Sequence, residues 1–181
     1  MSSEGEFEVV SSRTLAEGVF LRFEEVVLRS SAGEEVKRDV IRHPGGVAVL
    51  PIDGDDVWLI RQHRVALGRD IDEIPAGKLD QDGEDVADAA RRELLEELGA
   101  TARRLEHLAT MAPSPGYTDE VIEIYVAEGL DFGERAPQGA EEHGSTFYAL
   151  PIAEALDRIS RGELTDAKTL VALLEWNRRQ A

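Results

Sequence analysis

The sequence predicts a mixed α/β sandwich with a small β-rich segment in front of it. Three observations favour this class. Strand-like segments fill the first third of the chain, one acidic amphipathic helix stands near its middle, and two helical segments close it. Strands and helices alternate too rarely for a doubly wound sheet, so we expect helices packed on the faces of a mixed sheet.

Length and composition are those of a globular protein that buries its own core. The chain has 181 residues, of which 42% are hydrophobic, and this fits one domain with a small extra subdomain. It contains no cysteine, which excludes disulfides, thiolate zinc sites and cysteine nucleophiles. The first residues lack the pattern of a signal peptide, and no apolar run is long enough to span a membrane. We therefore expect a cytoplasmic protein.

The formal net charge of −17 disfavours binding to nucleic acid and to anionic membranes. Two interpretations of the excess carboxylates remain open. They either keep a solvated surface soluble, or some of them bind cations. The spacing of the glutamates along the chain bears on this choice.

The first third of the chain is expected to form strands. Residues 19–29 and 35–42 flank a turn of small and polar residues, as in a β-hairpin. Residues 46–52 are an uninterrupted apolar run, which is typical of a strand buried on both faces. After a DGDD turn, residues 56–64 are expected to form another strand, and residues 70–80 a short strand followed by a loop.

The next predicted element is a strong helix. Asp82 is its expected N-cap. Glu84 and Asp85 are favourable in its first turn, where the helix dipole attracts negative charge, and Gly99 is a suitable stop.

The last third mixes strands and helices. The pattern predicts strands at residues 100–112, 121–130 and 146–150, separated by polar loops at 114–120 and 131–145. Pro151 suits the first position of a further helix. An amphipathic helix over residues 166–179 is expected to close the chain.

The polar face of the central helix is a cluster of carboxylates. Glu93 and Glu97 are four residues apart and lie on one face, and Glu96 borders the same arc. The opposite side is expected to face the core with three leucines, Leu94, Leu95 and Leu98. Like charges at this spacing repel, and a bound magnesium ion, which prefers oxygen ligands, would offset the repulsion. A solvated acidic face is the alternative.

The full spacing of this segment resembles the Nudix box, a glycine followed by a glutamate and then by R-E-U-x-E-E-x-G-U, where U is apolar. The matching residues are Gly77, Glu84, Arg92, Glu93, Leu94, Glu96, Glu97, Gly99 and Ala100. One departure is the spacer KLDQDG, which is one residue longer than the family usually has. The resemblance implies a Nudix-type α/β/α sandwich with a mixed sheet, and hydrolysis of a nucleoside diphosphate compound.

The resemblance assigns roles to the residues of the box. Glu93 and Glu97 correspond to the principal metal ligands, and Glu96 to a further ligand or a group that supports them. The expected ion is Mg²⁺, with Mn²⁺ as an option. Arg92 corresponds to the residue that orients Glu93, and Glu84 to the glutamate at the helix start.

The loop before the helix completes the expected metal site. The carbonyl of Ala76 resembles the main-chain metal ligand of members that act on ADP-ribose. Gly77, the first residue of the box, would then allow a tight turn.

Flanking segments narrow the expected substrate. EIPAGKLD, RQHR, SPGYTDE and GELTDAKTLVALL resemble the ADP-ribose pyrophosphatase branch, and the likeness extends over residues 14–174. Pro115, sixteen residues beyond Gly99, matches the proline that marks this branch. The implied reaction is magnesium-dependent hydrolysis of ADP-ribose to AMP and ribose 5-phosphate. GDP-mannose, FAD or NADH as substrate, and a non-catalytic nucleotide-sugar-binding module, are the alternatives.

The same branch implies a homodimer whose N-terminal strands exchange between subunits. We therefore expect a subdomain over residues 1–43 and a Nudix domain over residues 44–181. In the subdomain, Phe20 or Val19 would lie against the adenine, and Arg38 would stack on it or contact the pyrophosphate; a core residue and a surface charge are the alternatives.

Two further groups of residues are expected at the substrate. Arg64 matches an arginine on the substrate side, with Gln62 assisting, and Arg61 is a weaker candidate for the same role. The loop before the last strand is expected to supply a catalytic glutamate. Glu142 is favoured over Glu141, and His143 is an alternative proton acceptor.

Overall fold

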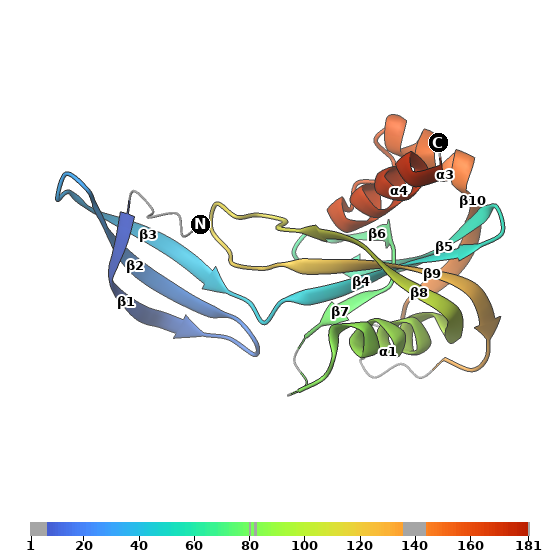
Figure 1. The fold of residues 1–181 in the computed structure, drawn as a ribbon, viewed down its shortest axis with the longest axis horizontal. Coiled ribbons are helices and arrows are strands. Elements are labelled where there is room, and N and C mark those ends of the chain that lie inside the picture. The colour runs from blue at the N-terminus through green and yellow to red at the C-terminus, as the bar shows by residue number, and fades with distance from the viewer. Residues whose placement is uncertain (1–6, 80, 82, 136–143, 181) are drawn as a thin grey trace. The chain divides into compact units, whose positions relative to one another are not determined.

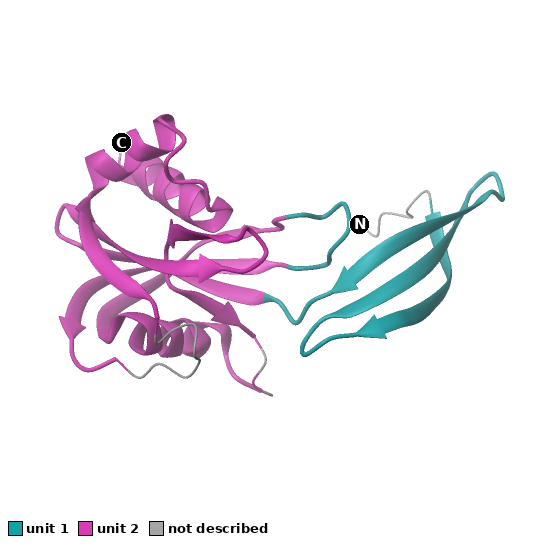
Figure 2. Ribbon diagram, turned by 180° about the vertical axis from the view of Figure 1, so that it is seen from behind, with its two compact units in different colours: residues 1–45, 114–120 teal, residues 46–113, 121–181 magenta. Residues whose placement is uncertain are grey.

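The computed structural model describes residues 7–79, 81, 83–135 and 144–180. The chain forms two compact units, which Figure 2 distinguishes by colour. Unit 1 contains residues 1–45 and 114–120, and unit 2 contains residues 46–113 and 121–181. Each unit is described by itself.

Unit 1 is a three-stranded antiparallel sheet in the order β1-β2-β3. The strands are β1 (Phe7–Glu17), β2 (Arg22–Ser30) and β3 (Glu35–Arg42). The predicted hairpin between β2 and β3 is confirmed, and Gly33, with a φ of 83°, closes its turn. Strand β1 was not among the expected strands, because every residue of it is exposed and its apolar residues do not alternate toward a core.

Unit 2 is built on a seven-stranded mixed sheet. Its path runs β10-β5-β4-β9-β8, with β6 paired to β5 and β7 paired to β4. Only β4 and β9 are parallel to each other; the other pairs are antiparallel. The strands are β4 (Gly46–Asp53), β5 (Asp56–Arg64), β6 (Arg69–Glu73), β7 (Ala76–Lys78), β8 (Ala100–Met111), β9 (Ile122–Phe132) and β10 (Thr146–Pro151).

Helices cover both faces of this sheet, so the predicted α/β/α sandwich is confirmed (Figure 1). Helix α1 (Val86–Leu98) packs on one face, and α3 (Ile152–Ser160) and α4 (Ala167–Gln180) pack on the other. The apolar run in β4 serves both layers: Val47 and Val49 join the cluster under α1, whereas Ala48 and Leu50 join the cluster under α3 and α4. Side chains alternate along a strand, so a run buried on both faces must be apolar throughout.

Two helix starts and the burial of one leucine differ from expectation. Helix α1 is capped by Asp85, whose Oδ1 accepts a hydrogen bond from the Ala87 NH at 2.9 Å, three residues after the expected Asp82; Asp82 lies outside the described residues. Pro151 ends β10 and caps α3 instead of occupying its first turn. Leu95 is 38% exposed, so of the three leucines expected to face the core only Leu94 and Leu98 do so.

Within the described residues, no helix is both long enough and apolar enough to cross a lipid bilayer.

Candidate functional site

Helix α1 holds three buried glutamates side by side. The exposed fractions of Glu93, Glu96 and Glu97 are 6%, 6% and 4%. Burial removes most of the hydration of a carboxylate, so such a cluster requires hydrogen bonds or cations. Because Leu94 and Leu98 bury the other side of the helix at 1% exposure, the register of the glutamates is fixed by the core.

Arg92 forms hydrogen bonds with Glu93 and Glu96 of this cluster and with Glu84. Arg92 donates from Nε and Nη2 to the two oxygens of Glu84, both at 3.0 Å. Its Nη1 donates to Glu93 Oε1 at 2.6 Å and to Glu96 Oε2 at 3.2 Å. The hydrogen bonds to Glu84 are the main reason why the pKa of Arg92 is raised; burial opposes this, and the charge of Glu93 adds to it. Arg92 thus holds Glu93, as expected, and also ties Glu84 and Glu96 to it.

The strand β7 lies against the same carboxylates. The NH of Ala76 donates to Glu97 Oε2 at 2.8 Å. A Cβ at position 77 would lie 1.9 Å from Glu93 Oε1, so a glycine is required there for space. The expected tight turn at Gly77 is wrong, because the residue pairs with Val47 inside β7 and its φ is not positive.

The end of α1 agrees with the prediction. Gly99 adopts the left-handed conformation, with a φ of 69°, and its NH donates to the carbonyls of Leu94 and Leu95. This geometry favours glycine because it has no Cβ.

Arg64 is held by a buried carboxylate of the neighbouring strand. Its Nε and Nη2 donate to Glu73 Oε1 and Oε2 at 2.8 and 2.7 Å. Burial alone would lower the pKa of Arg64. The hydrogen bonds and charge of Glu73 outweigh it and raise the pKa, with the charges of Glu97 and Asp166 adding to the effect. The interaction with Glu97 associates Arg64 with the glutamates of α1.

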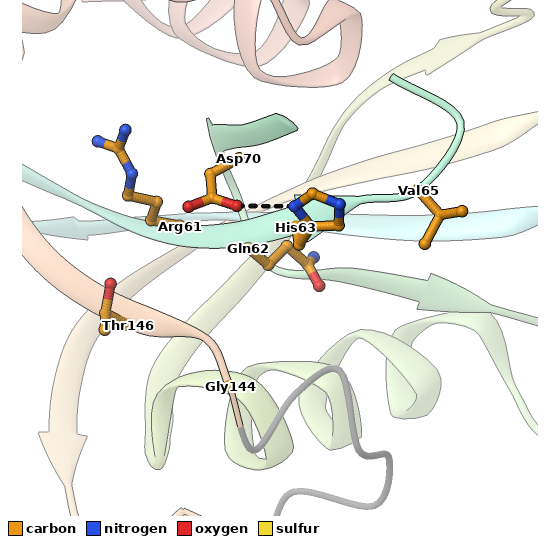
Figure 3. A pocket seen from close by; sticks show the side chains of 7 residues that line it. All are labelled: Arg61, Gln62, His63, Val65, Asp70, Gly144 and Thr146. Atoms are coloured by element: carbon orange, nitrogen blue, oxygen red, sulfur yellow. Dashed lines mark hydrogen bonds and ion pairs between the residues drawn. The ribbon is translucent and has the colours of Figure 1, made fainter. Parts of the chain in front are cut away.

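A cavity of about 330 Å³ opens beside β5 (Figure 3). The candidate residues Arg61 and Gln62 line it together with His63, whose Nδ1 lies 3.0 Å from Asp70 Oδ1. The remaining lining residues are Val65, Asp70, Gly144 and Thr146. Nη1 of Arg61 is 3.6 Å from a carboxylate oxygen of Asp72, which leaves the exposed arginine only weakly engaged.

The other candidates for substrate binding belong to unit 1. Phe20 is 45% exposed and meets His43 edge-to-face, with 5.6 Å between ring centroids. Val19 is fully exposed. Arg38 is exposed and donates to the Lys37 carbonyl at 2.8 Å, and Pro115 is an exposed turn residue. The glutamate cluster lies in unit 2.

The expected loop residues Glu141, Glu142 and His143 lie outside the described residues.

Reasoning from the sequence missed the buried Glu73 and its partner Lys168, whose ammonium contacts Glu73 Oε2. These two residues are 95 positions apart, and no local pattern links them.

The donor set of the cluster suits a hard cation. Carboxylate oxygens and a nearby backbone segment are the ligands that magnesium prefers. As the described side chains stand, no three acidic or histidine residues converge in a metal-binding arrangement. Glu93 and Glu96 are drawn toward Arg92, and Glu97 toward the Ala76 NH.

Comparisons with known proteins point to one family. The model of the NUDIX domain matches residues 42–172. The methanol dehydrogenase activator of Bacillus methanolicus is 41% identical over 142 residues, which covers 78% of this chain and 76% of that protein. The ADP-ribose pyrophosphatase of Mycobacterium tuberculosis is 35% identical over 173 residues, covering 95% and 84%.

A solved structure described as an ADP compounds hydrolase has the same fold. It superimposes with a TM-score of 0.85 at 26% sequence identity, and the match covers 100% of this chain and 99% of that chain. The likeness therefore extends over both units.

Proposed function

The chain belongs to the NUDIX family and is a Nudix hydrolase, and on that premise we propose that it hydrolyses the diphosphate bond of ADP-ribose to AMP and ribose 5-phosphate. The observation that carries the proposal is the buried cluster Glu93, Glu96 and Glu97, held by Arg92 on a helix that the core fixes. The substrate follows from the names of the similar proteins and from the flanking segments around Pro115.

We propose that the cluster holds Mg²⁺, with Mn²⁺ as a substitute, through Glu93, Glu96, Glu97 and the carbonyl of Ala76. When bound, such an ion neutralises charge on the diphosphate oxygens and lowers the pKa of its water. The protein's own residues hold the carboxylates in position. Arg92 offsets the repulsion between the carboxylates, and the missing side chain at Gly77 leaves room for Glu93.

Basic residues near the cluster are proposed to bind the diphosphate. Arg64 is 37% exposed in its side chain and is kept charged by Glu73. Arg61 and Gln62 line the cavity beside β5 and would contact the ribose phosphate half of the substrate. A planar guanidinium suits this role because it binds phosphate oxygens in pairs.

The remaining roles are proposals that rest on the family. Phe20 or Val19 of unit 1 would lie against the adenine, Arg38 would stack on it or contact the pyrophosphate, and Pro115 is the residue that marks the substrate class. Glu142, or Glu141 in its place, would accept the proton of the attacking water, and His143 is the alternative.

We propose that the protein works as a homodimer in the cytoplasm. The exposed apolar residues of β1, which include Phe7, Val9 and Leu15, support a contact with a second copy. The absence of cysteine is consistent with a reducing compartment.

The test is a substrate panel with and without Mg²⁺. Phosphate released by alkaline phosphatase from the monophosphate products would be measured for ADP-ribose, GDP-mannose, FAD and NADH. We expect ADP-ribose to give the highest kcat/KM and EDTA to abolish turnover. A higher kcat/KM for GDP-mannose, FAD or NADH would contradict the assignment of the substrate.

A further inference from the structure

The start of helix α4 is tied to the segment between β6 and β7 by buried polar contacts. Asp166 precedes the helix and accepts a hydrogen bond from the Thr169 NH at 3.0 Å, which caps it. The Thr169 hydroxyl donates to the same carboxylate at 2.6 Å and accepts from the Ile74 NH at 2.9 Å. Thr169 is 0% exposed, so water does not replace these bonds.

Lys168 is a buried cation in the same turn. It is 7% exposed, and its ammonium contacts Asp166 Oδ1 at 3.0 Å and Glu73 Oε2. Burying such a charge is expensive even when it is paired, and an apolar residue of similar size often serves packing as well. A buried lysine at this position therefore indicates a role in orienting its partner, Glu73.

Glu73 is the link between Lys168 and Arg64. It is 1% exposed, and its two oxygens form a fork with Nε and Nη2 of Arg64. The oxygen that binds Lys168, Oε2, also accepts from Arg64 Nη2. Lys168 thus restricts the rotation of the carboxylate, and a forked pair requires its two planar groups to stay aligned.

Arg64 retains surface for a ligand after it has formed the fork. Its side chain remains 37% exposed, while that of Glu73 is 1% exposed. An arginine whose orientation is fixed in advance loses less entropy when it binds an anion than a free arginine does.

We propose that Lys168 is a positioning residue, which acts through Glu73 to hold Arg64 in the orientation that binds the diphosphate of the substrate. The proposal rests on the proposed function for the nature of the ligand. It adds a contribution from α4, on the face of the sheet opposite the glutamate helix (Figure 1).

The experiment compares Lys168→Met, Lys168→Arg and Thr169→Val with the wild type. ADP binding would be measured by calorimetry in EDTA, so that the readout needs neither metal nor turnover, and kcat and KM would be measured with ADP-ribose. We expect Lys168→Met to weaken ADP binding and raise KM by about tenfold, the usual weight of one charge-assisted hydrogen bond. The change in kcat should be smaller.

Lys168→Arg keeps the cation and should restore ADP affinity to within about threefold of the wild type. Thr169→Val is the matched control, because it removes the hydroxyl's bonds to the Ile74 NH and to Asp166 but leaves Lys168 and Glu73 paired. It should retain ADP affinity even where its Tm falls. Wild-type ADP affinity in Lys168→Met, or an equal loss in Thr169→Val, would overturn the proposal.

If Lys168→Met does not fold, Glu73→Gln is measured in its place. It should lose ADP affinity by the same factor of about ten, and an unchanged affinity would count against the proposal. Failure of the proposed function gives a different result. In that case the wild type binds ADP but does not cleave ADP-ribose, and the ADP affinities of the variants can still be compared.

Discussion

Arg92 donates hydrogen bonds to three carboxylates around α1, those of Glu84, Glu93 and Glu96. Replacing it by methionine leaves Glu84, Glu93 and Glu96 without their shared cation. We expect Arg92→Met to lower the free energy of unfolding by about 2 kcal/mol and to reduce kcat/KM sharply. Urea denaturation and steady-state kinetics measure both effects.

The control for this variant is Arg91→Met on the same helix. Arg91 is mostly exposed and lies 3.3 Å from the exposed Asp88, and such surface pairs contribute less than about 1 kcal/mol. Equal losses of stability and activity in the two variants would contradict the special position of Arg92.

Substitution of Gly77 is expected to lower activity much more than stability. In Gly77→Ala the new Cβ would meet the Glu93 carboxylate at 1.9 Å. The end of a glutamate side chain moves easily, and the φ of residue 77 suits alanine. We therefore expect Tm to change by only a few degrees while kcat falls by roughly a hundredfold, because Glu93 is displaced.

Gly133→Ala is the matched control, since its Cβ would make only an ordinary contact of 3.9 Å. It should keep both Tm and kcat. A Gly77→Ala variant with wild-type kcat would show that the position of Glu93 does not matter for turnover.

At the scale of residues, the sequence allowed the glutamates to be placed on one face, because a spacing of four residues is a local property of a helix. The same applies to Arg92 and to the αL stop at Gly99. The pairing of Glu73 with Arg64 and Lys168 could not be predicted, because it depends on which strands and helices become neighbours in the fold. The lack of room for a side chain at position 77 could not be predicted either, because it results from the packing of β7 against Glu93 of α1.

At the scale of elements, the sheet of unit 1 contains a pH-dependent contact. Glu24 on β2 accepts hydrogen bonds from Arg42 at 2.9 Å and Ser12 at 2.8 Å. These bonds, with Arg42 first, lower the pKa of Glu24 below 4.5. A depressed folded-state pKa stabilises the fold above pH 4.5, and this contribution is lost as the pH falls through the folded-state value.

The Glu24→Gln variant tests this contact. We expect it to be less stable than the wild type at about pH 7, with the difference shrinking as the pH falls below 4.5 and through the lowered pKa of Glu24, because the wild-type carboxyl then becomes neutral. Thermal unfolding of both proteins at a series of pH values measures the gap. A gap that stays constant over this range would contradict the role assigned to the charge of Glu24.

The elements themselves were predictable where periodicity or capping is strong. The hairpin of β2 and β3, the buried strand β4 and helix α1 follow from local patterns. Strand β1 was missed because its side chains are exposed throughout, so its sequence carries no apolar alternation. The start of α1 was placed three residues too early, since Asp82 and Asp85 are equally good caps by residue type.

At the scale of the whole molecule, the proposed homodimer predicts the molar mass of the protein in solution. Light scattering after gel filtration should give twice the 19.9 kDa of the chain. Leu15→Lys places a charge among the exposed apolar residues of β1 and should shift the protein toward the monomer, because a charge in an apolar interface is costly. A wild type that elutes only as a monomer would contradict the proposal.

The α/β/α architecture was predictable as a whole, whereas the linkage between its layers was not. Composition and element order restrict the chain to a few layered arrangements. The contacts from α4 to Glu73 of β6 and to Ile74, which follows it, join residues 95 positions apart, and they exist only after the sheet has formed.

The proposed function requires that the glutamates of α1 are the metal-binding site of an ADP-ribose hydrolase. The most direct test is kcat/KM for ADP-ribose in the wild type and in Glu97→Gln, each with Mg²⁺ and with EDTA. Glu106→Gln, an exposed glutamate on β8, is the matched control.

The account predicts that Glu97→Gln lowers kcat/KM by roughly a hundred- to a thousandfold, that EDTA abolishes wild-type turnover, and that Glu106→Gln behaves as the wild type. Near wild-type turnover by Glu97→Gln in the presence of Mg²⁺ would contradict it.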